Sequence, residues 1–317
     1  GGDLHLTQVL AKAKASLDAQ NASGRTALMT ALLKGHYATA EALVSAGAQL
    51  EVRDSSGNTA LALSAQSGDV QALNLLIAAK ARLDVKNNVG CTPLMSAVNH
   101  CHVSAAKTLA DAGAALDIRD HSDYSALLQA VLQGSHAAAE VLITAKSSLN
   151  MTSPDGFTPL MLAVRECQTE ITGALVDAGA TLDIHDADGN TALTLAAQGS
   201  KIDILKRLIA ANASLNVKNK RGQTPLMCAV KASRRDAGEA LIAAKADLDA
   251  RDESGSTALA FAALNGDVNM LNQLISAKAA LDIRDAEDRT PIMLAVSENH
   301  AAAAKVLADA TDKDGNS

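Results

Sequence analysis

Three potential metal ligands in a row, His100, Cys101 and His102, are the residues whose types most suggest chemistry. Zinc prefers imidazole and thiolate ligands, and a structural zinc site needs four of them. Here adjacent side chains diverge, and no fourth ligand stands nearby in the sequence. We therefore favour an ordinary role in a turn, and we predict no metal site and no other cofactor.

Carboxylates are the second candidates, because paired acids can perform general acid–base catalysis. Most of them, however, recur at finger sites of a regular pattern, and five begin units: Asp54, Asp120, Asp186, Asp252 and Asp285. Asp at a turn commonly bonds the backbone of that turn, so a structural role is favoured. The nucleophile elbow, phosphate loop, dinucleotide fingerprint and H-E-x-x-H motif are all missing. We predict no catalytic residue and no enzymatic activity.

Composition narrows the class of protein further. The chain has 35 acidic and 28 basic residues, and its net charge of −7 argues against general nucleic-acid binding. It contains two Tyr, two Phe and no Trp, although 48% of its residues are hydrophobic. Ala and Leu must therefore form the core, which suits closely packed helices. No stretch reaches the roughly 18 apolar residues of a transmembrane helix.

A phrase recurs along the chain with a fixed period. It appears as NVGCTPLMSAV (88–98), PDGFTPLMLAV (154–164), KRGQTPLMCAV (220–230) and AEDRTPIMLAV (286–296). Its Thr, or a Ser in one variant, returns every 33 residues: Thr26, Thr59, Thr92, Ser125, Thr158, Thr191, Thr224, Thr257 and Thr290. A period of this length indicates stacked supersecondary units. The alternating wording indicates duplication of a 66-residue pair.

These nine units resemble the ankyrin repeat, a β-turn finger followed by two antiparallel helices. The resemblance covers residues 21–310 and implies an all-α fold, the ankyrin-repeat α-solenoid. We expect residues 1–20 to form an N-terminal capping half-repeat, 21–310 to form one continuous stack, and 311–317 to be a polar C-terminal tail. In the family phrase TPLH the His ties the finger to the helix. Here Met replaces it in odd repeats, as at Met95 and Met227, so we expect packing to replace that tie.

The local chemistry agrees with this pattern. Thr92 can cap the first helix of its repeat, and Pro93 suits the first helical position. Leucines recur before each finger, as at Leu83 and Leu149, and are predicted to be core. Lysines occupy a helix-ending site where the family prefers Gly: Lys80, Lys146, Lys245 and Lys278. A left-handed conformation there would cost each about 1–2 kcal/mol.

The four cysteines are predicted to be free thiols. Cys101 and Cys167 occupy equivalent turns two repeats apart, which is roughly 16–20 Å for helices packed about 8–10 Å from each neighbour. A disulfide needs Cα atoms about 4.4–6.8 Å apart. Cys91 and Cys228 have no evident partner. We therefore expect a cytoplasmic, reducing environment.

By analogy with ankyrin proteins, a partner should dock on the concave face formed by finger tips and first helices. The residue before each phrase Thr varies, and two aromatics are consecutive there, Tyr124 and Phe157. Leu132 and Arg165 end first helices in the same two repeats. We predict these four and His185 as partner-binding residues, because Arg and aromatics dominate interface energetics. Packing of the two rings on each other remains the alternative.

Basic residues show two further patterns. One ends most units (Arg53, Lys86, Arg119, His185, Lys218, Arg251 and Arg284), and we expect structural pairing with neighbouring Asp residues. The stretch 201–235 holds nine basic residues and one acidic residue, a local charge of +8. From it we predict a basic patch that can steer an acidic partner: Lys218, Lys220, Arg221, Lys231, Arg234 and Arg235. A merely solvated face is the alternative.

The function that follows is a non-catalytic protein–protein interaction scaffold, or adaptor, that binds a partner protein on its concave face. The alternative is a targeting domain that docks on membrane headgroups, RNA or an acidic protein through residues 201–235. We expect no specific nucleic acid and no transmembrane segment. The protein should act as a monomer or as part of a larger assembly, because ankyrin arrays bind unrelated partners on one scaffold.

Overall fold

The computed structural model describes residues 16–314 of the 317-residue chain. This described part contains eighteen helices and no strand; one isolated bridge pairs Arg119 with Ser125. The all-α solenoid prediction is therefore confirmed. Residues 1–15 of the predicted capping half-repeat lie outside the described part. The chain forms two compact units, residues 1–154 and 155–317, so the continuity of the stack across Pro154 stays a prediction.

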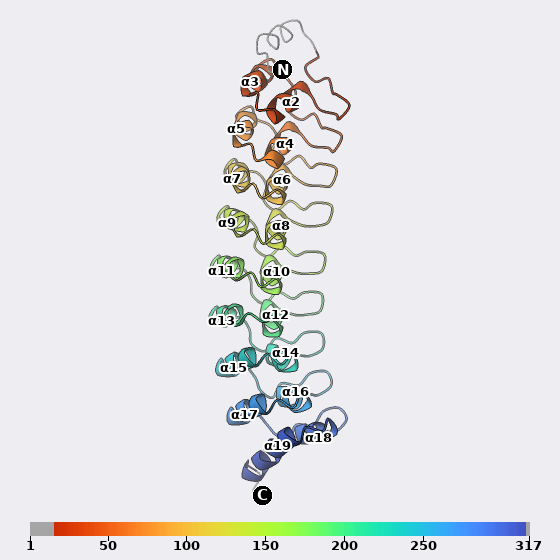
Figure 1. Ribbon diagram of the computed structural model, residues 1–317, viewed down its shortest axis with the longest axis vertical. Helices are drawn as coiled ribbons and strands as arrows, with labels where there is room; N and C mark the ends of the chain where they lie inside the picture. The colour runs from red at the N-terminus through yellow and green to blue at the C-terminus, as the bar shows by residue number, and fades with distance from the viewer. Residues whose placement is uncertain (1–15, 315–317) are drawn as a thin grey trace. The chain divides into compact units, whose positions relative to one another are not determined.

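Unit 1 holds the first four repeats as two rows of helices (Figure 1). Its first helices are α2 (Ala27–Leu33), α4 (Ala60–Ser67), α6 (Pro93–Asn99) and α8 (Ala126–Leu132). Its second helices are α3 (Tyr37–Ser45), α5 (Val70–Ala78), α7 (Val103–Asp111) and α9 (His136–Thr144). Each first helix contacts its own second helix, and α2, α4 and α6 each contact the next first helix. The fingers extend beyond the first-helix row.

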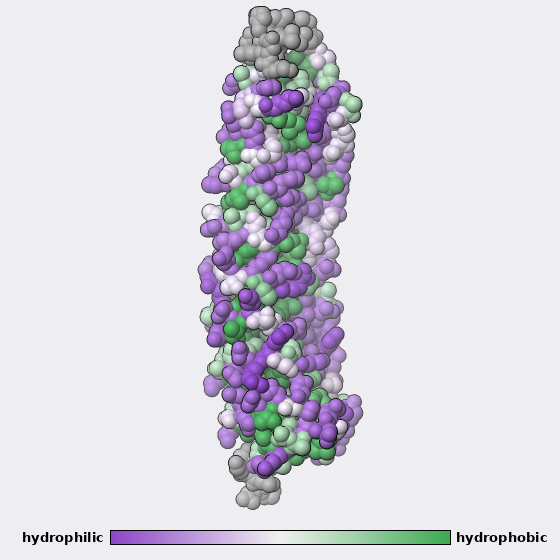
Figure 2. All heavy atoms as spheres, in the orientation of Figure 1, coloured by the Kyte–Doolittle hydropathy of each residue, from purple (hydrophilic) through white to green (hydrophobic). Residues whose placement is uncertain are grey.

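Unit 2 repeats this arrangement for the last five repeats. Its first helices are α10 (Pro159–Arg165), α12 (Ala192–Gln198), α14 (Pro225–Lys231), α16 (Ala258–Leu264) and α18 (Pro291–Ser297). Its second helices are α11 (Thr169–Asp177), α13 (Ile202–Ala210), α15 (Arg235–Ala243), α17 (Val268–Ser276) and α19 (Ala301–Asp314). On the face shown in Figure 2, hydrophobic residues form small groups among hydrophilic ones.

The phrase Thr or Ser starts each first helix. Its side-chain oxygen accepts the backbone N–H three residues later in the first eight repeats, at 3.3 Å for Thr92 and Met95. Pro93 occupies the first turn, where its missing N–H leaves no bond unmade. The predicted capping is therefore confirmed. Because these helices have only seven to nine residues before α19, their stability comes from stacking.

Left-handed residues end the helices where the sequence predicted them. Lys80, Lys146, Lys245 and Lys278 have φ between 67° and 73°, and Asn212 has φ 63°. The four lysines therefore carry the strain expected at sites better suited to Gly. The same conformation lets the backbone N–H of the left-handed residue and of the next one bond the last helical carbonyls, as at Lys80 and Ala81.

The core consists of Leu, Ala and Met from both helix rows. Leu73, Leu109 and Leu142 are fully buried, and so are Met95 and Met227 at 1% exposure. The recurrent leucines before each finger, such as Leu83 and Leu149, are only half-buried. The prediction that they are core is therefore wrong, because they lie in the loop that has already left the helix stack. The Ala two residues earlier is buried instead, as at Ala81.

The last helix is longer than its equivalents. α19 runs Ala301–Asp314, so residues 311–314 are helical although we assigned them to a polar tail. Thr311 stands where other repeats have a left-handed residue, and its hydroxyl bonds the carbonyls of Leu307 and Ala308 at 3.2 and 2.8 Å. A β-branched residue resists the left-handed conformation, so the helix continues.

Candidate partner-binding surfaces

The recurrent Asp residues stabilise the fingers from within. Asp120 Oδ1 accepts the N–H groups of Ser122 and Tyr124 at 2.8 and 3.0 Å. Equivalent pairs of bonds occur at the other four sites, Asp54, Asp186, Asp252 and Asp285. Burial alone would raise the pKa of the Asp285 carboxyl, but hydrogen bonds from Arg289 hold it below its ordinary value. The predicted bonding of these Asp residues to their own turns is confirmed.

The basic ladder connects successive fingers through main-chain carbonyls. Arg119 Nη1 donates to the Thr152 carbonyl at 2.7 Å and pairs with Asp123 of its own finger at 2.8 Å. Lys218 Nζ donates to the Arg251 carbonyl, and Arg251 Nη2 donates to the Arg284 carbonyl, both at 2.8 Å. The ladder is structural here. The expected pairing with Asp of a neighbouring finger is wrong at these sites, because the neighbour's carbonyl is nearer.

Tyr124 and Leu132 are the predicted partner-binding residues that belong to unit 1. Tyr124 is half-buried in a finger, where its backbone bonds Asp120 in both directions. Leu132 ends α8 with 43% of its surface exposed, among the few large apolar side chains that reach solvent. An exposed Leu beside polar turns can contribute apolar area to a partner, although single exposed apolar residues are common.

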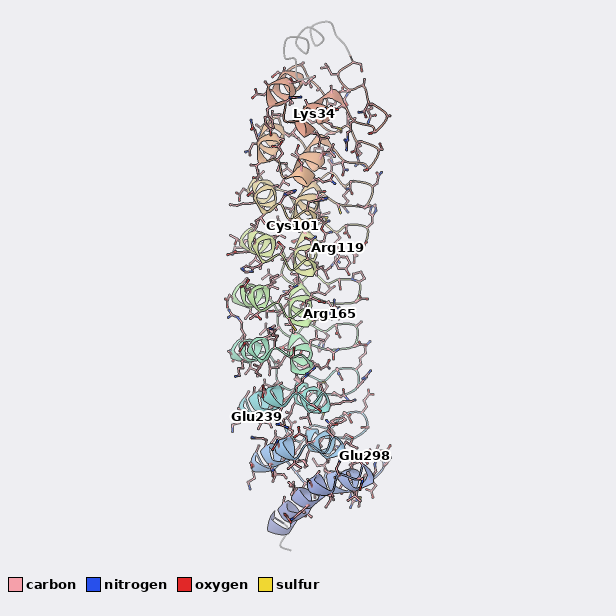
Figure 3. All side chains as sticks on the ribbon, in the orientation of Figure 1. Lys34, Cys101, Arg119, Arg165, Glu239 and Glu298 are labelled. Atoms are coloured by element: carbon pink, nitrogen blue, oxygen red, sulfur yellow. The ribbon has the colours of Figure 1, made fainter. Side chains whose placement is uncertain are left out.

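Phe157, Arg165 and His185 belong to unit 2. The Arg165 guanidinium carbon lies 4.5 Å from the centroid of the Phe157 ring, so α10 and its finger form one continuous surface at the first-helix row (Figure 3). Arg165 Nε also pairs with Glu166 at 3.1 Å. His185 is not part of this pair: its Nδ1 lies 3.0 Å from the Gly189 carbonyl of its own finger. The structure thus brings two of the three together.

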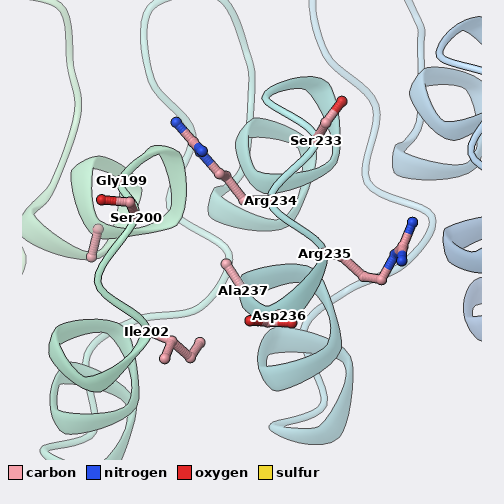
Figure 4. Close-up of a pocket in the computed structure, with 9 residues that line it drawn as sticks. Gly199, Ser200, Ile202, Ser233, Arg234, Arg235, Asp236 and Ala237 are labelled. Carbon is pink, nitrogen blue, oxygen red and sulfur yellow. The ribbon is translucent and has the colours of Figure 1, made fainter.

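The basic patch divides into separate groups. Lys218, Lys220 and Arg221 lie on the seventh finger, and Lys231 ends α14. Arg234 and Arg235 follow at the turn and extend in opposite directions (Figure 4). Arg234 Nε bonds the Gln198 carbonyl at 3.0 Å, whereas Arg235 pairs with Asp267 at 3.4 Å. These two side chains therefore connect the seventh repeat to its neighbours on either side.

An open pocket of about 270 Å³ lies beside that turn, lined by Gly199, Ser200, Arg234, Asp236 and others (Figure 4). It forms where the sixth repeat departs from the pattern. Gly199 ends α12 in an extended conformation, at φ −76° and ψ −179°, whereas Gly68 ends α4 at φ 72°. The pocket contains both charge signs and no concentrated set of catalytic groups.

The sequence did not predict the contacts around Cys228 and Phe261, two buried residues that we call the floor of the seventh repeat. Cys228 is 2% exposed, and its Sγ lies 3.9 Å from Asn219 Nδ2 and from Gln223 Oε1 of the finger. Lys231, one turn later on α14, places its Nζ 5.3 Å from the centroid of Phe261 on α16. The three-residue spacing of Cys228 and Lys231 was a usable signal, since it puts both on one helix face.

The same kind of floor occurs in the third repeat, around Cys91. Asn99 Nδ2 lies 3.8 Å from Cys91 Sγ. Burial raises the pKa of both the Cys91 and the Cys228 thiols. Asp120 raises that of Cys91 further. For Cys228, a hydrogen bond with Gln198 and the charges of Lys231 and Arg221 act the other way. All four cysteines are free.

The His100–His102 segment forms a helix–helix turn. The two rings stack with centroids 6.4 Å apart, and His100 Nδ1 lies 2.8 Å from the Ser96 carbonyl. Across residues 16–314, no three His, Cys, Asp or Glu side chains gather closely enough to hold a metal ion. No helix in the described part is both long and apolar enough to cross a membrane.

Comparison with known proteins identifies the family. The family model for ankyrin repeats in three copies matches residues 48–120, 116–186, 168–252 and 235–317, and a second ankyrin repeat model matches residues 1–44. The chain belongs to the ankyrin repeat family. Ankyrin repeat proteins are generally non-catalytic modules that typically mediate protein–protein interactions. No curated protein sequence matches this chain.

Two solved ankyrin repeat structures are similar. The ankyrin repeat domain of Bcl-3, described as a unique member of the IkappaB protein family, is 26% identical with a TM-score of 0.64, covering 69% of this chain and 99% of its own. The ankyrin repeat protein EF0377 is 24% identical with a TM-score of 0.55, covering 57% and 96%. The first supports the family assignment, and the second supports the fold.

This ankyrin chain lacks the His of the TPLH phrase, and Met takes over part of its role. The N–H groups of Thr92 and Thr224 lie 3.5 Å from the Sδ atoms of Met95 and Met227. The thioether is a weak acceptor, so these contacts add to the packing that we expected to replace the His. Full burial of both Met side chains confirms that packing.

Proposed function

We propose that this ankyrin repeat chain is a non-catalytic scaffold that binds a partner protein on the concave surface of its fingers and first helices. The observation that carries the proposal is the stacked pair of Phe157 and Arg165, which joins a finger to a first helix. The side chain of Arg165 is 43% exposed. A guanidinium held on a ring retains exposed donors for a partner while losing little side-chain entropy.

Tyr124, Leu132 and His185 belong to the same proposal as secondary contacts. Exposed Leu132 supplies apolar area, and half-buried Tyr124 supplies a ring with a polar edge. We further propose that the protein acts in a reducing, cytoplasmic compartment, as a monomer or within a larger assembly, which its four free thiols support.

A quantitative pull-down from native lysate tests the proposal. The variants are Arg165→Ala, Phe157→Ala and the pair Tyr124→Ala with Leu132→Ala. The matched control is Arg207→Ala on second helix α13, since Arg207 is 42% exposed and also paired, with Asp177. We expect specific partners to lose about tenfold in affinity with Arg165→Ala or Phe157→Ala, as for an interface hot spot. Equal retention by these variants and the control would overturn the site.

A second candidate function is docking on an anionic partner through the basic patch of residues 201–235. It is favoured by Arg221 and Lys231, neither of which takes part in an ion pair among the described residues. Membrane headgroups, RNA and acidic proteins share the required negative charge. Such binding should weaken steeply as salt is added, because the release of counterions into a more concentrated salt solution gains less entropy.

A further inference from the structure

The seventh repeat carries a positive surface that we call the repeat-seven basic surface. It consists of Arg221 on the finger and Lys231 at the end of α14, above a floor of Cys228 and Phe261. No acidic residue occurs from residue 204 to residue 235. The two cations therefore act on this surface without a neutralising neighbour in their own finger or first helix.

The seventh finger, which carries Arg221, and α14, which carries Lys231, meet at Cys228. Cys228 bonds Gln223 of the finger and lies within electrostatic reach of both cations. The ammonium of Lys231 rests 5.3 Å from the centroid of Phe261, which is 8% exposed. The ring restricts the lysine chain and leaves the outer side of the ammonium for a ligand, so part of the ordering cost of binding is already met.

Three other cations of residues 201–235 are engaged elsewhere. Arg207 pairs with Asp177, Arg235 pairs with Asp267, and Lys218 donates to the Arg251 carbonyl. Within the described residues, Arg221 and Lys231 have no such ion pair. An incoming carboxylate therefore breaks no ion pair of the described residues at these two side chains.

Acidic finger tips bound the positive surface on both sides. Asp188 of the sixth finger and Glu253 of the eighth are exposed, and the whole chain carries −7. A membrane surface or an extended nucleic acid would meet these carboxylates as well as the cations. The floor also offers no exposed aromatic platform for bases, since Phe261 is buried. A ligand about one repeat wide avoids both problems.

We propose that the repeat-seven basic surface binds a short acidic segment of a partner protein, whose Asp or Glu carboxylates pair with Arg221 and Lys231. The inference rests on the proposed scaffold function and names the chemistry of its partner.

Fluorescence anisotropy with the full chain tests this. The probe is a short labelled peptide of alternating Glu and Ser, compared with the same peptide carrying Gln for Glu. The test variant is Arg221→Glu with Lys231→Glu. Its matched control is Lys206→Glu with Lys305→Glu, which makes the same charge change at exposed positions of second helices. Circular dichroism confirms that both variants fold.

At low salt we expect the wild type and the control to bind the Glu peptide within about twofold of each other. The test variant should bind at least about tenfold more weakly, and the Gln peptide should not bind. Equal losses in both variants, or no binding by the wild type, would overturn the inference. So would stronger retention of phosphatidylserine vesicles or single-stranded RNA than of the Glu peptide.

The pull-down separates this inference from the proposed function. Partners that are lost with Phe157→Ala but kept by the Arg221→Glu/Lys231→Glu variant would retain the scaffold and reject the acidic segment. Partners lost with the charge-reversed variant and kept by its control support both proposals.

Discussion

Repeats three and seven carry nearly the same phrase, GCTPLMSAV and GQTPLMCAV, yet their floors face charges of opposite sign. Each floor holds a buried cysteine beside an Asn amide, Cys91 with Asn99 and Cys228 with Asn219. Asp120 acts on the first thiol, whereas Lys231 and Arg221 act on the second. The nine residues that the two repeats nearly share therefore build the scaffold, and residues on either side of them determine the charge that a partner meets.

The largest expected effect tests whether Met95 and Met227 contribute equally to the free energy of unfolding in repeats three and seven. Met95→Ala and Met227→Ala should each lower the free energy of unfolding by about 2–5 kcal/mol and by similar amounts, because both side chains are 1% exposed and leave a cavity. Denaturant unfolding measures both. Met293→Ala is the matched control at the same phrase position, and it should cost less because Met293 is 49% exposed. Equal losses at all three sites would contradict the packing argument.

A smaller expected effect tests whether Phe261 positions Lys231 on the repeat-seven basic surface. A double-mutant cycle on Lys231→Gln and Phe261→Leu should give a coupling of about 0.5–1 kcal/mol in unfolding free energy, as for a cation on a ring face. The pair Arg165→Gln and Phe157→Leu offers a second cycle of the same type, with 4.5 Å between the groups. Zero coupling in both cycles would mean that neither ring positions its cation.

The smallest effect is the direction of two thiol shifts. Asp120→Asn should lower the pKa of Cys91, since it removes a negative charge, and Lys231→Gln should raise the pKa of Cys228, since it removes a positive one. Thiolate absorbance against pH measures each, with the other cysteines replaced by Ala. Asn is suited to position 120, because Asn87 and Asn219 make the same finger bonds. Shifts of the same sign would contradict the comparison.

The raised thiol pKa values also predict how stability depends on pH. Burial lifts both above the ordinary 9.0, so the folded state holds these protons more tightly than the unfolded state. Their contribution is fully present below pH 9.0 and is lost as the pH rises through the folded pKa values. Replacing Cys91 and Cys228 with Ala should flatten that alkaline decline in unfolding free energy, and an unchanged decline would assign it to other groups.

Much of the fold could be predicted because its signals are local. Thr92 starts a helix by accepting the N–H of Met95, and Pro93 has no N–H that needs a partner. Lys80 reaches φ 67° because the chain must reverse there. The recurrent Leu before each finger was misjudged, since identical spacing does not reveal whether a loop residue is covered. The extension of α19 was also not predicted: Thr311 stands where a left-handed residue ends the equivalent helices, and here the helix continues.

The candidate sites were less predictable. Phe157 and Arg165 were singled out because they interrupt a pattern, but their contact depends on how the fifth finger meets α10. Lys231 and Phe261 were not connected by the sequence, because they are 30 positions apart on different helices. His185 was predicted to contact a partner, and its ring nitrogen Nδ1 lies 3.0 Å from the Gly189 carbonyl of its own finger.

The sequence by itself determined the repeat, its helix ends and the composition of its core, since each depends on residues a few positions apart and on their conformational preferences. Only the tertiary structure decided which cations are engaged. Arg119, Lys218 and Arg251 look alike in the sequence and all donate to a carbonyl 33 residues away, whereas Arg221 and Lys231 form no ion pair within residues 16–314. Stacking brings repeats into contact, and that contact separates a structural charge from one available to a partner.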